Sequence, residues 1–207
     1  MKERITNKHS LIAGLTGSIA TGKSLVASYF EQMGAFIIEA DKIYADLVSP
    51  GRPLLKLIAM EFGKEILNQD GSLNRKIMGQ KAFSSEDNRL KLNRITHPFI
   101  INTIIEKINE AIDKKIILVT APLIIESNML SIFDCLIVIV CSREQQIERL
   151  MKRDVLTKEE AESRIIAQLS SEDKLKYADY VINNSETREK VYQNTYHIYT
   201  KLQKSTK

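Results

Sequence analysis

The residues with the clearest chemical meaning form a turn near the start of the chain. Gly17 is followed by four residues and then by Gly22, Lys23 and Ser24, which gives the pattern Gly-x-x-x-x-Gly-Lys-Ser. Glycine lets a backbone approach phosphate closely, and successive N–H groups of such a loop can point at phosphate oxygens. Lysine adds charge for the β- and γ-phosphates, and the serine hydroxyl is an oxygen ligand for Mg²⁺. The pattern predicts a phosphate-binding loop with Ser24 as the metal ligand.

Acidic residues follow the second apolar run of the chain. This run ends in Ile-Ile-Glu-Ala-Asp, which places Glu39 and Asp41 at its carboxyl end. We expect this strand to lie beside the one that carries the glycine-rich turn, with Asp41 at the same sheet edge. A carboxylate there could accept a proton from a substrate hydroxyl or hold Mg²⁺ through water. The alternative for Asp41 is an N-cap on a helix that starts near Lys42. Glu39 is the weaker candidate, because a solvated edge residue would look the same.

Two other classes of phosphate-loop protein are disfavoured by what the chain lacks. The guanine-reading pattern Asn-Lys-x-Asp and the switch pattern Asp-x-x-Gly of GTPases do not occur in it. Motor and transport ATPases usually end a strand with an acid, but the third apolar run ends at Thr120 and continues into Ala121 and Pro122. The next acid, Glu126, comes later. The chain therefore fits neither of these two classes.

The elements that must position these residues follow from periodicity. Five short apolar runs are continuous rather than alternating, as strands covered on both faces should be. They are Leu11–Leu15, Ala35–Ile38, Ile116–Thr120, Cys135–Cys141 and Tyr180–Ile182. Segments of helical period lie between them, and this alternation predicts an α/β fold with a five-stranded parallel sheet and helices on both faces.

Two connections are longer than a plain crossover needs. Residues 43–115 contain helical pieces at 54–62, 75–83 and 98–113 but no convincing strand, which predicts a helical insertion. Pro98 suits the first position of the last piece. Residues 143–179 are charged and helical, and Thr157 with Glu160 predicts a capping box there.

Composition limits partners and compartment. The 207-residue chain is 43% hydrophobic and carries a net charge of +4, with no Trp, so we expect no nucleic-acid partner. The two cysteines share one predicted strand too far apart for a disulfide, so we expect two buried thiols, a reducing compartment and hence the cytoplasm. The apolar run after the basic N-terminus is too short for a signal peptide, and Ile132–Cys141 is too short to span a membrane.

Several blocks in a fixed order make the chain resemble the dephospho-CoA kinases from about Leu11 to Asn184. Beyond the glycine-rich turn, the blocks are GAFIIEAD (34–41), PGRPLLKLIAMEFGKEILNQDGSLNR (50–75), RLKLNRITHP (89–98), PLIIE (122–126), QIERLMKRD (146–154) and ADYVINN (178–184). The chain departs from the usual pattern at four places. Ser18 and Ala20 stand where the family usually has glycine, and Glu39 and Asn74 stand where it usually has Asp.

The resemblance implies a reaction and a division of the chain. ATP would phosphorylate the ribose 3′-hydroxyl of dephospho-CoA and give CoA and ADP, the last step of CoA synthesis, with Mg²⁺. A P-loop core of the nucleotide-kinase type would comprise about 11–42, 116–142 and 179–207. The insertion at about 43–115 would bind the CoA moiety, and about 143–178 would form a lid over ATP. We expect ATP and dephospho-CoA as partners, no membrane, and a monomer or small homo-oligomer.

The resemblance also implies roles for individual residues. Asp41, Lys23 and Arg149 would be catalytic. ATP would be bound by Gly17, Ser18, Ile19, Ala20, Thr21, Gly22, Lys23, Ser24, Leu25, Arg149, Arg153 and Asn183. The acceptor would be bound by Asp41, Arg75, Arg89, Asn93, His97, Pro98 and Glu126. Arg149 and Arg153 are four residues apart, hence on one helix face.

Structural alternatives remain open for the weaker candidates. The two lid arginines could form a solvated basic face paired with Glu144 or Glu148, and His97 could be a structural residue. Arg75, Arg89 and Asn93 could belong to a salt-bridged helix face. Two other functions remain as alternatives: another small-molecule P-loop kinase, such as a nucleotide kinase, and a non-catalytic nucleotide-binding regulator.

Overall fold

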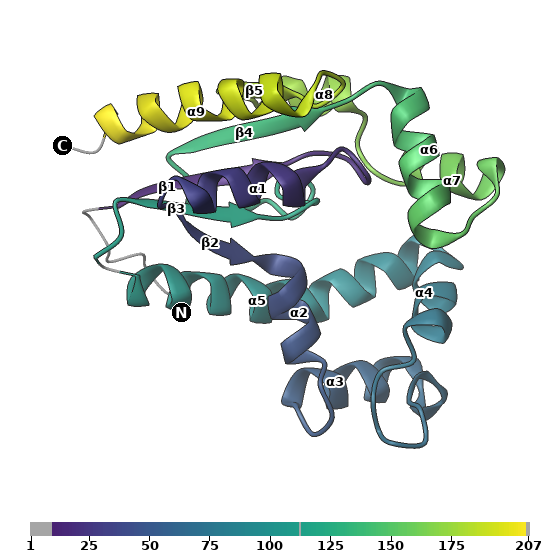
Figure 1. Ribbon diagram of the computed structural model, residues 1–207. Coiled ribbons are helices and arrows are strands. Elements are labelled where there is room, and N and C mark those ends of the chain that lie inside the picture. The colour runs from purple at the N-terminus through teal and green to yellow at the C-terminus, as the bar shows by residue number, and fades with distance from the viewer. Residues whose placement is uncertain (1–9, 112, 206–207) are drawn as a thin grey trace. The chain divides into compact units, whose positions relative to one another are not determined.

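A five-stranded parallel sheet forms the centre of the α/β core (Figure 1). The computed structural model describes residues 10–111 and 113–205. The strands are β1 (Leu11–Thr16), β2 (Phe36–Glu39), β3 (Ile116–Thr120), β4 (Cys135–Val140) and β5 (Tyr180–Asn183), and their order across the sheet is β2-β3-β1-β4-β5. All five predicted strands are confirmed, and no predicted bound differs from the observed one by more than one residue.

One expectation about the sheet is wrong. Strand β3 lies between β2 and β1, so the strand that leads to Asp41 is not the neighbour of the strand that leads to the glycine-rich turn. A crossover connection leaves a place in the sheet that a later strand can fill, and sequence order alone does not fix which strand takes it. Strand β1 therefore occupies the centre, paired in parallel with β3 on one side and β4 on the other.

The described residues fall into two compact units, 10–38 with 108–205, and 39–107. The first unit holds most of the sheet together with α1 (Lys23–Gln32), η2 (Leu130–Ile132), α6 (Arg143–Asp154), α7 (Lys158–Ile166), α8 (Ser171–Leu175) and α9 (Arg188–Ser205). The second holds α2 (Ala40–Leu47), α3 (Pro53–Phe62), η1 (Lys64–Ile66), α4 (Arg75–Phe83) and most of α5 (Glu86–Glu110). No described helix combines the length and apolar composition needed to cross a bilayer.

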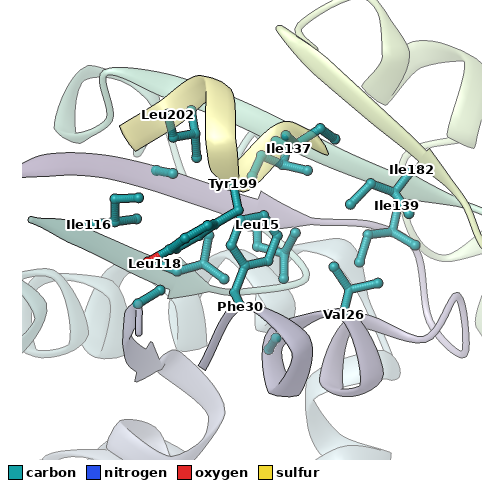
Figure 2. Close-up of a cluster of buried hydrophobic side chains, with 14 of the residues drawn as sticks. Leu15, Val26, Phe30, Ile116, Leu118, Ile137, Ile139, Ile182, Tyr199 and Leu202 are labelled. Atoms are coloured by element: carbon teal, nitrogen blue, oxygen red, sulfur yellow. The ribbon is translucent and has the colours of Figure 1, made fainter. Parts of the chain in front are cut away.

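One face of the sheet packs against α1 and α9. Alternate residues of the three central strands, such as Leu15, Leu118 and Ile137, are fully buried on this face. Figure 2 shows these side chains packed together with side chains of α1 and α9. The rings of Phe30 and Tyr199 meet edge to face with centroids 6.2 Å apart. Each fully buried large side chain contributes about 1.5–3 kcal/mol, which makes this face a firm support for the turn that follows β1.

The helical unit has its own apolar core, formed largely by α3, η1 and α4. It includes Leu54 and Ile58 of α3 and Ile66 of η1. Helix α4 spans the predicted residues and begins at an N-cap, where the Asn74 side chain accepts a hydrogen bond from the N–H of Ile77 at 3.1 Å. Asn and Asp cap helices about equally well, so the departure at Asn74 preserves the local structure.

The structure corrects the predicted start of α5. The helix begins at Glu86, twelve residues earlier, and Pro98 lies inside it. A proline inside a helix cannot donate to the carbonyl four residues before it, and this loss costs least where the carbonyl can reach water. Pro98 is exposed, which accounts for its tolerance. By contrast, the predicted capping box of Thr157 and Glu160 is confirmed at the start of α7.

The two cysteines are free, as predicted, but they are half-buried rather than fully buried. Burial first, and then the nearby carboxylates of Asp179 and Asp134, raise the pKa of the Cys135 thiol to about 12. Burial also raises the pKa of Cys141, against the opposing effect of Arg149. Both thiols therefore stay protonated near neutral pH.

Candidate active site

The glycine-rich turn follows β1 at the centre of the sheet and runs directly into α1. At Gly17 and Gly22 there is no room for a side chain. A side chain at Gly17 would lie 2.6 Å from the carbonyl oxygen of Ile139, and one at Gly22 would lie 1.9 Å from Nδ2 of Asn184. Gly22 also has a φ of 96°, which side chains rarely adopt. The turn thus has the strand-turn-helix setting that a phosphate-binding loop needs.

Lys23 and Ser24 open helix α1. The Lys23 ammonium donates to the carbonyl oxygens of Gly17 at 2.7 Å and Ser18 at 3.3 Å, so it curls over the turn. No side chain caps the helix, and its first N–H groups have no acceptor within the helix. The positive end of the helix and the ammonium together favour an anion at this turn.

Arg149 of α6 reaches the same turn. Its Nη2 donates to the carbonyl oxygen of Asn184 at 3.0 Å. Its Nη1 is buried and has no hydrogen-bond partner. A side chain at Gly22 would lie 3.8 Å from this atom, which places the guanidinium directly beside the turn. A buried donor without a partner is costly, and a phosphate oxygen would satisfy it.

Arg153 has different surroundings. Its guanidinium makes two hydrogen bonds to the carboxylate of Asp154, at 2.8 and 3.1 Å, and Arg164 donates to the same carboxylate at 2.8 Å. These bonds, the one from Arg153 first, hold the pKa of Asp154 below its usual value. The Arg153 side chain is therefore held by Asp154.

Asp41 lies in the first turn of α2, one residue inside the helix, and its side chain is exposed. The N-cap position belongs to Glu39, and no side-chain capping bond is present there. The capping alternative for Asp41 is therefore excluded. Glu39 instead pairs with Lys42 at 2.7 Å on the surface. The Asp41 carboxylate has no hydrogen bond or ion pair with any other described residue, which leaves both oxygens available.

The earlier start of α5 places three of the predicted acceptor-binding residues on one helix. Arg89, Asn93 and His97 are spaced by four residues within one helix, so they share a face. Arg89 is loosely paired with Glu86 at 3.5 Å. His97 is half-buried, and burial lowers its pKa, so its ring is neutral at pH 7. Arg75 begins α4 and opposes the rise that burial causes in the pKa of Tyr44.

Comparisons with known proteins bear on this arrangement. Residues 11–189 match the family model described as dephospho-CoA kinase. The dephospho-CoA kinase of Listeria monocytogenes is 42% identical over 185 residues, which are 88% of this chain and 92% of that protein. The chain belongs to the dephospho-CoA kinase family. The resemblance read from the sequence blocks is thereby confirmed, as is the predicted kinase class.

Solved structures agree with this dephospho-CoA kinase fold. The dephospho-CoA kinase from Campylobacter jejuni superposes with a TM-score of 0.69 at 30% identity, over 95% of this chain and 98% of that one. A crystal structure of the Thermus thermophilus protein TT1252 gives a TM-score of 0.80 at 24% identity, over 94% and 98%. The second likeness concerns the fold alone.

The sequence patterns did not indicate several residues that hold the glycine-rich turn. Asn183, the predicted ATP contact, ends β5 and accepts from the N–H of Ser185 at 3.0 Å. The next residue, Asn184, is buried and donates from Nδ2 to the carbonyl oxygen of Thr21 at 2.7 Å. Gln146 and Gln168 also bond to the turn. Nothing in the sequence around these two asparagines indicates that the second one holds the turn.

Glu126 was predicted to contact the acceptor, and the structure places it in an ion pair. Its Oε1 lies 2.8 Å from the ammonium of Lys174, whose side chain is fully buried. Lys174 also donates to the carbonyl oxygen of Pro122 at 2.8 Å. The second carboxylate oxygen of Glu126 is buried without a partner. This pair fastens α8 to the loop after β3 within the sheet unit.

The residues present fit a weakly held magnesium ion. Among the described residues, no group of three histidine, cysteine or acidic side chains could form a dedicated metal site. Ser24 is exposed at the positive end of α1 and makes no hydrogen bond to other described side chains. Mg²⁺ in phosphoryl-transfer enzymes is usually held by few protein atoms together with phosphate and water oxygens. A single hydroxyl ligand matches that arrangement.

Proposed function

We propose that this chain transfers the γ-phosphoryl group of ATP to the ribose 3′-hydroxyl of dephospho-CoA, giving CoA and ADP. The observation that carries the proposal is the buried, unpartnered Nη1 of Arg149 beside the turn of Gly22 and Lys23. A donor in that position is satisfied by a phosphate oxygen and otherwise costs about 1–3 kcal/mol.

The nucleotide half of the proposal uses the sheet unit. The backbone of residues 17–25 surrounds the phosphates, and Lys23 exchanges its carbonyl partners for the β- and γ-phosphate oxygens. Arg149 keeps Asn184 as one partner and donates its second nitrogen to phosphate. Arg153 and Asn183 complete the proposed ATP contacts from α6 and from the end of β5.

We propose Ser24 as the protein ligand for Mg²⁺. When bound, Mg²⁺ would neutralise charge on the β- and γ-phosphate oxygens. The chain's own contribution is to hold the phosphate oxygens against Lys23 and the first turn of α1, so that the leaving group is oriented before transfer.

The acceptor half of the proposal uses the helical unit as the CoA-binding insertion. Asp41 accepts the proton of the 3′-hydroxyl while that oxygen bonds to the γ-phosphorus and the bond to the β–γ bridging oxygen breaks. Arg89, Asn93 and His97 offer one helix face to the acceptor. Further contacts are proposed for Arg75, Pro98 and the free oxygen of Glu126. We place the lid over ATP at about 143–178.

The proposal extends to the setting of the reaction. ATP and dephospho-CoA are the proposed partners, and a chain with two free cysteines suits the reducing cytoplasm. A nucleotide kinase and a regulator without catalysis are the competing functions. A regulator without catalysis has no need of an acceptor-reading face such as that of α5, whereas a nucleotide kinase would use such a face for a nucleotide acceptor.

A coupled assay of ADP release tests the proposal. The purified chain is given ATP and Mg²⁺ with dephospho-CoA, with AMP, or with no acceptor, and the product is weighed by mass spectrometry. We expect ADP release only with dephospho-CoA and a product heavier by one phosphoryl group. Equal kcat/KM for AMP would favour the nucleotide kinase, and ATP binding without turnover would favour the regulator.

A further inference from the structure

The phosphate-binding turn of this chain contains a strained residue. Ala20 has a φ of 61°, in the left-handed region where a side chain meets its own backbone. Glycine would adopt this conformation freely, and the family pattern that the sequence resembles usually has glycine here. Something in the structure must therefore hold Ala20 in place, because an unrestrained alanine would leave this conformation.

Two glutamines hold the peptide groups beside Ala20. Oε1 of Gln168, just after α7, accepts from the N–H of Ile19 at 2.8 Å. Nε2 of Gln146, on α6, donates to the carbonyl oxygen of Ile19 at 2.6 Å. Since that carbonyl belongs to the peptide bond between Ile19 and Ala20, the two side chains fix the orientation of the chain as it enters the strained residue.

The side chains of the turn are fixed from the same direction. The hydroxyl of Ser18 donates to the carbonyl oxygen of Leu169 at 3.2 Å. The side chains of Ile19 and Ala20 pack against an apolar cluster of α6 and α7, centred on Leu150 and Ile165. The two residues that replace the usual glycines thus both have partners in this region, which a glycine could not have.

The two glutamines that bond to Ile19, Gln146 and Gln168, are themselves held in place. The N–H of Leu169 donates to Oε1 of Glu126 at 3.3 Å, and the same oxygen binds the buried Lys174. Gln146 is almost fully buried, so its amide has a fixed place. An anchored side chain can impose a conformation on the turn, whereas a mobile one would follow it.

We propose that Gln146 and Gln168 are positioning residues that keep the turn in its phosphate-binding shape, and that this clamp makes glycine dispensable at position 20. The proposal rests on the proposed binding of ATP at this turn. It concerns nucleotide affinity, because the clamp touches the backbone of the turn and neither the acceptor nor the transferred group.

The first test measures ADP affinity by calorimetry and KM for both substrates. Gln168→Leu should weaken ADP binding and raise the KM for ATP about tenfold, which corresponds to one lost hydrogen bond, with the KM for dephospho-CoA within about twofold of the wild type. Gln203→Leu, a similar change on α9, is the matched control and should alter neither. Unchanged ADP affinity in Gln168→Leu would overturn the proposal.

Two carboxylate variants distinguish the effect of the hydrogen bonds to Ile19 from the effect of an added negative charge. In Gln168→Glu an oxygen can still accept from Ile19, whereas Gln146→Glu loses its donor and sets an oxygen against a carbonyl. Both variants add the same charge near the turn. We expect Gln146→Glu to bind ADP at least about tenfold more weakly than Gln168→Glu. The reverse order would contradict the clamp.

The deciding test uses Ala20→Gly as a second background. Glycine needs no restraint to adopt a positive φ, so Gln168→Leu should cost much less ADP affinity in the Ala20→Gly protein than in the wild type. Equal losses in both backgrounds would show that the glutamine does not act through Ala20, and would overturn the inference. Because ADP binding needs no acceptor, the comparison of ADP affinities can be interpreted even if the acceptor proves not to be dephospho-CoA.

Discussion

Arg149 has two tasks that only a guanidinium can combine. One nitrogen donates to the carbonyl oxygen of Asn184, and the other points, buried and unpartnered, beside Gly22. The first bond orients the second nitrogen, so in the proposed reaction the charge would meet the phosphates without reorganisation during transfer. A lysine would carry the charge but would have to choose between the two partners.

Arg149 substitutions should therefore behave unequally. We expect Arg149→Ala to lower kcat by about 10²–10³, and Arg149→Lys to recover less than about a tenth of the loss. Arg153→Ala serves as the control on the same helix and should cost less, because Asp154 engages that side chain in the free protein. Steady-state kinetics of each variant measures these losses in kcat. Full recovery of kcat by Arg149→Lys would refute the claim that Arg149 must bind Asn184 and phosphate at the same time.

Asp41 is exposed, unpaired among the described residues, and not a capping residue. If it accepts the hydroxyl proton, Asp41→Asn should lower kcat by about 10²–10⁴ while both KM values change little, because an amide keeps the shape and cannot take the proton. Asp46→Asn, at another exposed acid of α2, is the matched control and should keep wild-type kinetics. A near-normal kcat for Asp41→Asn would remove the base assignment.

At the scale of elements, Pro98 shows where pattern reading failed. Its type suggested a helix start, yet α5 begins at Glu86 and continues through it. Pro98→Ala should restore one backbone hydrogen bond and raise stability by about 1–2 kcal/mol. The control is Pro53→Ala at the first position of α3, where proline is well suited and the change should not stabilise. Thermal unfolding of both variants distinguishes the two positions.

The same substitution tests the proposed acceptor contact. If Pro98 touches dephospho-CoA, Pro98→Ala should raise the KM for that substrate although the protein is more stable. A stabilised variant with unchanged KM would make Pro98 a purely structural feature of α5.

Other elements were predictable for reasons that are local. The five strands are continuous apolar runs, and the capping box of α7 is a short-range pattern. The glycine-rich turn indicates a strand directly before it and a helix directly after it. What could not be predicted depends on pairing between distant segments. Three such features join residues far apart in sequence: the place of β3 between β1 and β2, the bond of Asn184 to Thr21, and the bond of Gln168 to Ile19.

For the molecule as a whole, His97 links stability to pH. Burial lowers its pKa in the folded chain below the value of 6.5 expected when unfolded. Between those two values the unfolded chain binds a proton that the folded chain does not, so stability is complete above about pH 6.5 and falls as the pH drops below it. The carboxylates with lowered pKa, such as Asp154 and Asp173, act only below their ordinary value of 3.8.

The window between pH 7.5 and 5.5 therefore isolates the histidines. Urea unfolding followed by circular dichroism should show the wild type losing stability across this window, and His97→Gln losing distinctly less, because the glutamine takes up no proton in either state. His197→Gln, at an exposed histidine of α9, is the control and should follow the wild type. The same pH dependence in His97→Gln as in the wild type would mean that burial of His97 does not oppose its protonation. The neutral state assigned to the His97 ring would then have to be given up.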